Sequence, residues 1–188
     1  MNTTKQWIFV GGCIALVAAG LVTLARTMSD TLRIIEVGSP APDFVAVPVT
    51  GPEGSRPAPK TLADYRGQVV LLNLWATWCG PCVKEMPSIQ ALYDELGPRG
   101  LKVVAVSVDN PGMESAIRAF GTTHRLTFEL LHDDRQRGIQ EAYLTTGVPE
   151  TFVIGRDGTI RKRVSGGTDW NTSAQRALLR QLLDETAQ

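Results

Sequence analysis

Residues 69–82 read VVLLNLWATWCGPC, an apolar run that leads directly into two cysteines three positions apart. The apolar run predicts a buried strand, and the segment that carries the cysteines predicts the first turn of a helix. A helix N-terminus stabilises a thiolate through its unpaired backbone donors and its dipole. We therefore expect a reactive pair at Cys79 and Cys82, suited to dithiol/disulfide exchange.

The composition fits one ordinary globular domain with a short appendage. The chain has 188 residues, of which 43% are hydrophobic and 20% are charged. Lys plus Arg and Asp plus Glu both number 19, so we expect no nucleic-acid partner. The three cysteines are too few for a disulfide-stapled secreted mini-protein, and two of them share one motif. That usage favours redox or metal chemistry.

The appendage is an uncharged, apolar run between Lys5 and Arg26. As a helix, such a run extends roughly 28 Å, close to the thickness of a bilayer's hydrocarbon core. We expect residues 1–27 to form one N-terminal transmembrane helix that anchors the chain, and residues 28–37 to form a linker. A cleaved signal peptide is the alternative. Cys13 lies inside the run and is interpreted as a small hydrophobic residue.

Residues 38–188 alternate between short apolar runs and amphipathic segments, which predicts an α/β domain whose sheet is covered on both faces. Strands are expected at 45–47, 69–75, 103–108, 128–131, 151–154 and 159–164. Helices are expected at 81–96, 113–122 and 172–183, with a shorter one through Ile139 and Tyr143. The middle helix and strand are interpreted as an insertion into a smaller core fold.

Four motifs in series resemble the membrane-tethered thioredoxin-like oxidoreductases of the TlpA, ResA and CcmG (DsbE) group. They are APDF at 41–44, NLWATWCGPC at 73–82, EMP at 85–87 and GVPETF at 147–152. The resemblance covers nearly the whole of residues 38–183. It implies a thioredoxin-like fold with a central helix–strand insertion. It also implies a bacterial cytoplasmic (inner) membrane location, single-pass, with the catalytic domain on the periplasmic side.

Each residue of the cysteine motif is expected to have its own role in disulfide exchange. Cys79, at the start of the helix, is expected to be the exposed nucleophile, and Cys82, one turn deeper, is expected to be the resolving thiol. Gly80 and Pro81 are expected to tune the relative stability of the two redox states. Trp78 flanks the nucleophile and is expected to contact the substrate.

The remaining site residues follow from the resemblance. Pro149 matches the family's cis-proline, which leaves the backbone of Val148 free to pair with a substrate peptide; a plain turn proline is the alternative. Glu85 matches a carboxylate that shuttles a proton to or from the deeper thiol, against an ordinary exposed glutamate. Glu150 contacts the partner protein or modulates the nucleophile, or is only a polar residue at a strand start. Asn73 stands where thioredoxin has a buried acid, which gives more weight to Glu85.

The resulting hypothesis is an extracytoplasmic thiol-disulfide oxidoreductase, acting as a reductant in cytochrome c maturation or related assembly. Its partners are expected to be a disulfide-containing protein, such as apocytochrome c or its maturation proteins, and a membrane electron donor. No cofactor and no metal are expected. A copper-centre assembly factor of the same fold and a thiol peroxidase that uses Cys79 are the alternatives. A zinc site lacks a second ligand pair, because His124 and His132 are distant from the motif in sequence.

Overall fold

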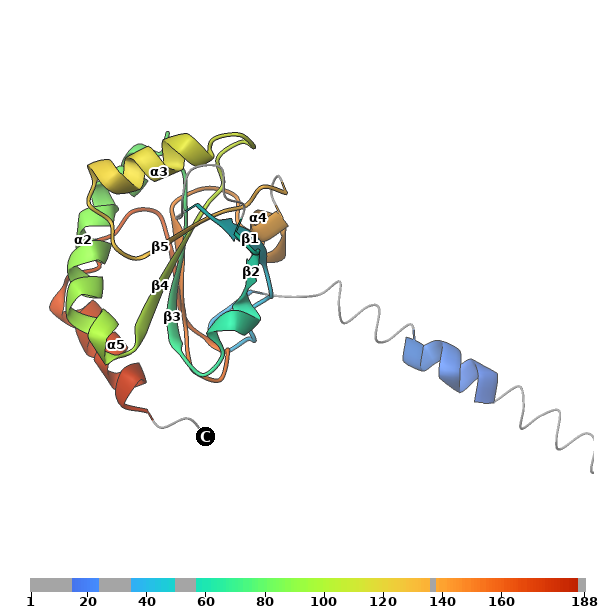
Figure 1. Ribbon diagram of the computed structural model, residues 1–188. Coiled ribbons are helices and arrows are strands. Elements are labelled where there is room, and N and C mark those ends of the chain that lie inside the picture. The colour runs from blue at the N-terminus through green and yellow to red at the C-terminus, as the bar shows by residue number, and fades with distance from the viewer. Residues whose placement is uncertain (1–14, 24–34, 50–56, 136–137, 186–188) are drawn as a thin grey trace, which may run out of the picture. The chain divides into compact units, whose positions relative to one another are not determined.

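The computed structural model describes residues 15–23, 35–49, 57–135 and 138–185. Ile35–Gln188 forms one compact unit. Residues 15–23 form a helix that belongs to a separate unit. Within these ranges no helix combines the length and the apolar character that a bilayer crossing requires. The predicted anchor at 1–27 lies mostly outside the described residues and stays a prediction (Figure 1).

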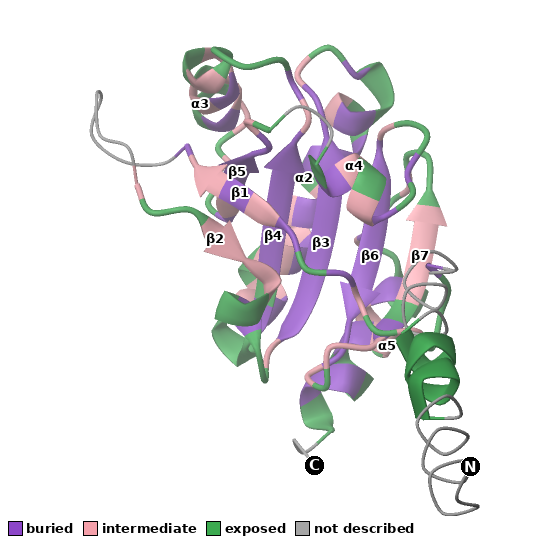
Figure 2. Ribbon diagram, turned by 90° about the vertical axis from the view of Figure 1, so that its right-hand side faces the viewer, coloured by how far each residue is buried: buried purple, intermediate pink, exposed green. Residues whose placement is uncertain are grey.

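A mixed sheet of seven strands forms the centre of the domain. Its spatial order is β2 (Lys60–Thr61), β1 (Val45–Pro48), β5 (Glu129–His132), β4 (Leu101–Ser107), β3 (Val69–Trp75), β6 (Glu150–Ile154) and β7 (Ile160–Ser165). Strands β3, β4 and β5 are parallel, and the outer strands pair antiparallel. Figure 2 shows β3 buried along its whole length, as expected for a central strand with helices on both sides.

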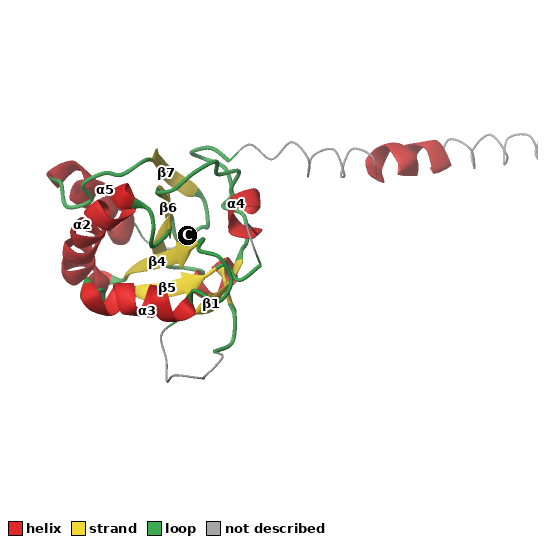
Figure 3. Ribbon diagram, turned by 90° about the horizontal axis from the view of Figure 1, so that it is seen from above, coloured by secondary structure: helices red, strands yellow, loops and turns green. Residues whose placement is uncertain are grey.

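Helices cover both faces of the sheet. One face packs against α2 (Gly80–Leu96), α3 (Glu114–Thr123) and α5 (Ser173–Asp184), and the other packs against α4 (Gly138–Ala142) and a 3₁₀ helix at Leu62–Tyr65 (Figure 3). Successive side chains of β3 point to opposite faces of the sheet and so belong to two separate hydrophobic cores. Leu71 lies in the core beneath α2, and Leu72 lies in the core that contains Tyr143 and Phe152.

The expected α/β architecture is confirmed, and the predicted strands and longer helices appear within one or two residues of their expected bounds. β2 and the following 3₁₀ helix were not predicted. β2 has only two residues, and it exists because it pairs with β1, Thr61 opposite Val45. The N–H of Leu62 then donates to the carboxylate of Asp43 at 2.8 Å. These are long-range contacts that a local sequence pattern does not contain.

The sheet register brings the predicted site residues to one edge. β3 and β4 are parallel, so the carboxyl ends of both strands lie at the same edge, where Trp75 is paired with Ser107. β6 runs antiparallel to β3 with Glu150 opposite Leu74, so β6 begins at this same edge. The cysteine motif after β3 and the proline before β6 therefore meet there.

Candidate active site

A tight turn after β3 places Cys79 immediately before α2. The N–H of Cys79 donates to the carbonyl of Ala76 at 3.1 Å, and α2 begins at Gly80 with Pro81 in its first turn. Proline is well tolerated there, because the first helical N–H groups have no partner inside the helix. Cys79 is the N-cap residue, and its Sγ accepts the backbone N–H of Cys82 at 3.2 Å. The sulfur thus occupies the position where helix donors stabilise negative charge.

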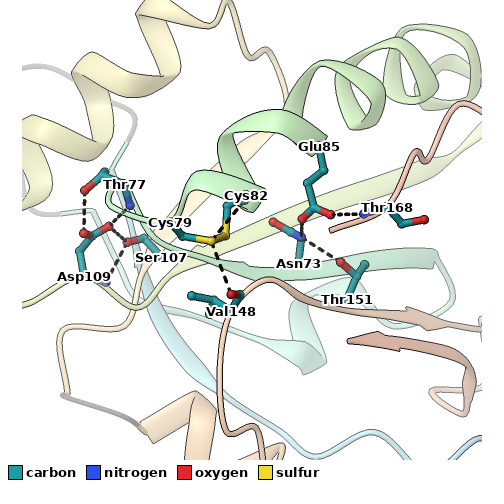
Figure 4. The surroundings of a disulfide bond; sticks show 10 residues. All are labelled: Asn73, Thr77, Cys79, Cys82, Glu85, Ser107, Asp109, Val148, Thr151 and Thr168. Carbon is teal, nitrogen blue, oxygen red and sulfur yellow. Dashed lines mark hydrogen bonds between the residues drawn. A yellow bond between two sulfur atoms is a disulfide. The ribbon is translucent and has the colours of Figure 1, made fainter. Parts of the chain in front are cut away.

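Cys79 and Cys82 are joined by a disulfide with an S–S distance of 2.08 Å, so the structure represents the oxidised protein (Figure 4). Cys79 is 4% exposed and Cys82 is 0% exposed. The expectation of an exposed Cys79 is therefore wrong for this state, although Cys79 is the more accessible cysteine of the pair. Its covering comes partly from the loop that precedes β6.

That loop contains the Val148–Pro149 peptide bond, which is cis as predicted. The carbonyl oxygen of Val148 lies 3.5 Å from Sγ of Cys79, so the loop faces the disulfide directly (Figure 4). Val148 is half-buried, whereas Pro149 is buried. The loop is tied to the segment after β7, because Gly166 N–H donates to the carbonyl of Pro149 at 2.8 Å. Its proposed role in substrate binding stays a prediction.

Two neighbours of the cysteines have distinct surroundings. Trp78 is 70% exposed, an unusually high value for a tryptophan, and it lies next to the nucleophile at the surface. Pro81 packs closely against Gly167, where a Cβ would lie 3.3 Å from Cβ and from the carbonyl oxygen of Pro81. The absence of a side chain at Gly167 therefore permits the close approach of this loop to the motif.

Glu85 is buried on α2, one turn beyond Cys82, and is only 3% exposed. Its Oε1 accepts Nδ2 of Asn73 at 2.8 Å, and its Oε2 accepts the N–H of Thr168 at 3.2 Å. Burial raises the pKa of Glu85, while these two hydrogen bonds oppose the shift. The alternative of an ordinary exposed glutamate is excluded by the burial.

The carboxylate of Glu85 also borders a groove between α2 and the loop after β7. The groove has a volume of about 420 Å³, and it is lined by Pro81, Lys84, Glu85, Ser88, Gly167, Thr168 and Asp169. One end of the Glu85 carboxylate contacts the interior through Asn73, and the other end contacts the wall of this groove. A proton on Glu85 is therefore close to both the core and a solvent-accessible space.

Asn73 has a larger part than the sequence indicated. From the sequence, Asn73 is only the residue that replaces the buried acid of thioredoxin. In the structure it is fully buried and donates to both Glu85 and Thr151, the latter at 2.9 Å. The available signal was a single amide in an otherwise apolar strand, since such a group needs partners when it is buried.

Glu150 lies on the other face of the sheet. It is buried and forms an ion pair with Arg163, with 2.6 Å between Oε1 and Nε, and the same oxygen accepts Ser165 Oγ at 2.9 Å. Its neighbour Thr151 points instead to the α2 side, toward Asn73. The expected roles of Glu150, contact with a partner protein or modulation of Cys79, stay predictions.

Within the described ranges, no group of three or more His, Cys, Asp or Glu side chains is arranged to hold a metal ion. The chemistry that the described groups do support is thiol chemistry. It combines a cysteine at a helix N-terminus, a second cysteine beneath it and a buried acid one turn further along α2.

The chain is similar to a protein family and to several known proteins. Residues 37–163 match the model of the AhpC/TSA family. A thiol-disulfide oxidoreductase ResA of Oceanobacillus iheyensis is 37% identical over 153 residues, which is 81% of this chain and 77% of that protein. The thioredoxin-like protein YneN of Bacillus subtilis is 35% identical over 160 residues, covering 84% of this chain and 88% of that protein. A crystal structure from Chlorobium tepidum, described as a thiol:disulfide interchange protein DsbE, has a TM-score of 0.63 at 27% identity, covering 80% of this chain and 96% of that one.

Proposed function

Because this chain belongs to the AhpC/TSA family and is a thiol-disulfide oxidoreductase of the TlpA, ResA and CcmG group, we propose that it reduces protein disulfides outside the cytoplasm. The observation that carries the proposal is the placement of Cys79 at the N-terminus of α2, against the carbonyl of Val148. A sulfur in this position is activated as a thiolate and faces the loop on which an extended substrate would lie.

The exchange proceeds in two steps. In the reduced protein, the Cys79 thiolate attacks one sulfur of the partner's disulfide, and the partner's other sulfur leaves as a thiolate and takes up a proton. Cys82 then attacks the Cys79 sulfur of this mixed disulfide and releases the second partner thiol. Two electrons pass from the dithiol to the partner, and the Cys79–Cys82 disulfide seen here remains.

Glu85 supports the second step as the base for Cys82. Both residues lie on the buried side of α2, three positions apart, which places them on neighbouring turns of one face. A carboxyl group with a raised pKa accepts the thiol proton more readily than an ordinary one. The groove beside Glu85 then provides a route by which the proton reaches solvent.

The cellular setting completes the proposal. A reductant outside the cytoplasm needs a membrane protein to resupply its electrons. Cytochrome c maturation, with apocytochrome c or its maturation proteins as the partner, is the proposed task, and residues 1–27 are the proposed single-pass anchor. Thioredoxin carries the same Gly-Pro pair between its cysteines as this chain has at Gly80 and Pro81. This match supports electron transfer from the chain to its partner. Topology is tested by attaching a reporter that is active only outside the cytoplasm to the C-terminus.

Assays on the full-length chain in detergent distinguish this activity from the alternatives. We expect rapid reduction of a protein disulfide, a reduction potential near that of thioredoxin, about −270 mV, and negligible peroxide turnover. Peroxide turnover as fast as disulfide reduction would favour a thiol peroxidase. Tight, stoichiometric Cu(I) binding by the reduced chain would favour a copper-centre assembly factor.

A further inference from the structure

We infer that Asp109 is a positioning residue for the nucleophile, because it fixes the turn that presents Cys79. The turn runs from Ala76 to Cys79, and its second residue, Thr77, is held twice by the Asp109 carboxylate (Figure 4). The backbone N–H of Thr77 donates to Oδ2 at 2.9 Å, and its hydroxyl donates to Oδ1 at 2.7 Å. The inference rests on the proposed role of Cys79 and adds a residue that the exchange steps do not include.

Asp109 is itself held rigidly at the end of the sheet. It is 3% exposed, and its Oδ2 accepts the hydroxyl of Ser107 at 2.6 Å while its N–H donates to the oxygen of that hydroxyl at 3.1 Å. Nε2 of the fully buried His132 lies 2.9 Å from the carbonyl oxygen of Asp109. Val108, which lies between Ser107 and Asp109 in the chain, extends the pairing of β4 with β3. Its N–H donates to the carbonyl of Trp75 at 2.8 Å. The carboxylate of Asp109 is therefore bonded to β4 through Ser107, and the Asp109 backbone is held against β5 through His132.

The two bonds to Thr77 determine what the rest of the turn does. A carboxylate that accepts both the N–H and the hydroxyl of one residue fixes the orientation of that residue's peptide group and side chain together. Trp78 is then directed to solvent, and Cys79 reaches the N-cap position with its sulfur near Cys82 N–H. Apart from the disulfide and the contacts of the Cys79 sulfur with Cys82 and Val148, the bonds to Asp109 are the only side-chain hydrogen bonds of this turn among the described residues. In the reduced protein, which lacks the disulfide, loss of the Asp109 bonds lets the sulfur leave its place at the helix terminus.

A positional role and a purely electrostatic role of Asp109 predict opposite changes in the pKa of Cys79 when the side chain is removed. If Asp109 acted only through its negative charge, its removal would favour the nearby thiolate and lower the pKa of Cys79. If Asp109 acts by position, its truncation moves the sulfur away from the helix donors and raises that pKa toward the ordinary value of about 8.5. Asp109→Asn separates the two effects, because it removes the charge but keeps a side chain of the same shape. Its single oxygen can accept the N–H of Thr77, and its NH₂ group can donate to the Thr77 hydroxyl oxygen.

The experiment measures the alkylation rate of Cys79 against pH in the reduced full-length chain. We expect Asp109→Ala to raise the apparent pKa of Cys79 and to slow its alkylation at neutral pH by about tenfold, while Asp109→Asn stays within about threefold of wild type. Thr77→Ser keeps the hydroxyl and should behave as wild type, whereas Thr77→Val should show an intermediate loss.

Asp133 supplies the matched control. It is 1% exposed, follows β5 at the same sheet edge and accepts the N–H of Ile139 at 2.9 Å, but it does not hold the cysteine turn. Asp133→Ala should lower the melting temperature as Asp109→Ala does, without changing the pKa of Cys79. The inference is overturned if Asp109→Ala and Asp109→Asn shift that pKa equally, or if the control shifts it as much. A wild-type chain that fails to reduce protein disulfides refutes the proposed function, but it leaves this alkylation comparison standing.

Discussion

Replacing Glu85 by glutamine separates the chemical role of its carboxylate from its packing role. Glu85→Gln keeps the side chain's shape, and its amide oxygen can still accept the N–H of Thr168. The new NH₂ group then faces Nδ2 of Asn73, which is also a donor. Oδ1 of Asn73 has no hydrogen-bond partner among the described residues, so rotation of that amide offers an acceptor. The expected penalty is therefore about one hydrogen bond, or about 1 kcal/mol of unfolding free energy.

The expected loss of activity is much larger than the structural loss. General acid–base catalysis by a placed side chain contributes about 10²–10⁴ in rate, and glutamine cannot take a proton. We expect stopped-flow measurements of Glu85→Gln to show normal formation of the mixed disulfide by Cys79 and a slowing of about 10² or more in its resolution by Cys82. Resolution at the wild-type rate would refute the assignment of Glu85 as the base.

The same variant makes a prediction about stability against pH. Burial raises the pKa of Glu85 above its ordinary value of 4.5, so the folded chain holds this proton more tightly than the unfolded chain does. The stabilisation is fully present below that ordinary value and is lost as pH rises through the folded pKa. Denaturant unfolding over a pH series should therefore show this decline in wild type and in the control Glu129→Gln, but not in Glu85→Gln. If the unfolding free energy of Glu85→Gln fell with rising pH as in wild type, Glu85 would not be the group whose raised pKa causes the fall.

Three further outcomes are expected. In the reduced wild-type chain, residue-resolved alkylation should modify Cys79 first, with an apparent pKa below about 8.5, and equal slow reaction of Cys82 would oppose the assigned order. Gly167→Ala should slow disulfide exchange, because the new Cβ would lie 3.3 Å from the carbonyl oxygen of Pro81 in the motif. An unchanged rate would show that the loop containing Gly167 shifts to accept the Cβ without disturbing the motif. Glu150→Gln should lower the free energy of unfolding by about 2 kcal/mol, because it removes the charge that pairs with Arg163. A raised KM for a protein disulfide would support the predicted contact of Glu150 with the partner, and an unchanged KM would oppose it.

The sequence predicted the central elements because their signals are local. Residues 69–75 are apolar except for the amide of Asn73, which is the pattern of a strand buried on both faces. Gly97, next to Pro98, gave a clear end to α2, and the structure ends the helix at Leu96. The cis peptide at Pro149 came only from the resemblance to a family, because a proline before a strand is otherwise most simply a turn residue.

Parts of the site depend on register and were not predictable in this way. The bonds from Asp109 to Thr77 exist because β3 and β4 end side by side, which no spacing in the sequence states. Glu150 follows the cis-proline directly, but the alternation along β6 turns its side chain to the face opposite α2. The low exposure of Cys79 likewise depends on a loop nearly seventy residues away in the chain, at Val148.

Covalent trapping tests the central claim most directly. A full-length Cys82→Ala chain, reduced and mixed with a protein disulfide, should accumulate a mixed disulfide that peptide mapping assigns to Cys79, and Cys79→Ala should form no such adduct. If the adduct forms through Cys82 instead, or if neither variant captures the partner while the wild-type chain reduces it, Cys79 is not the attacking sulfur.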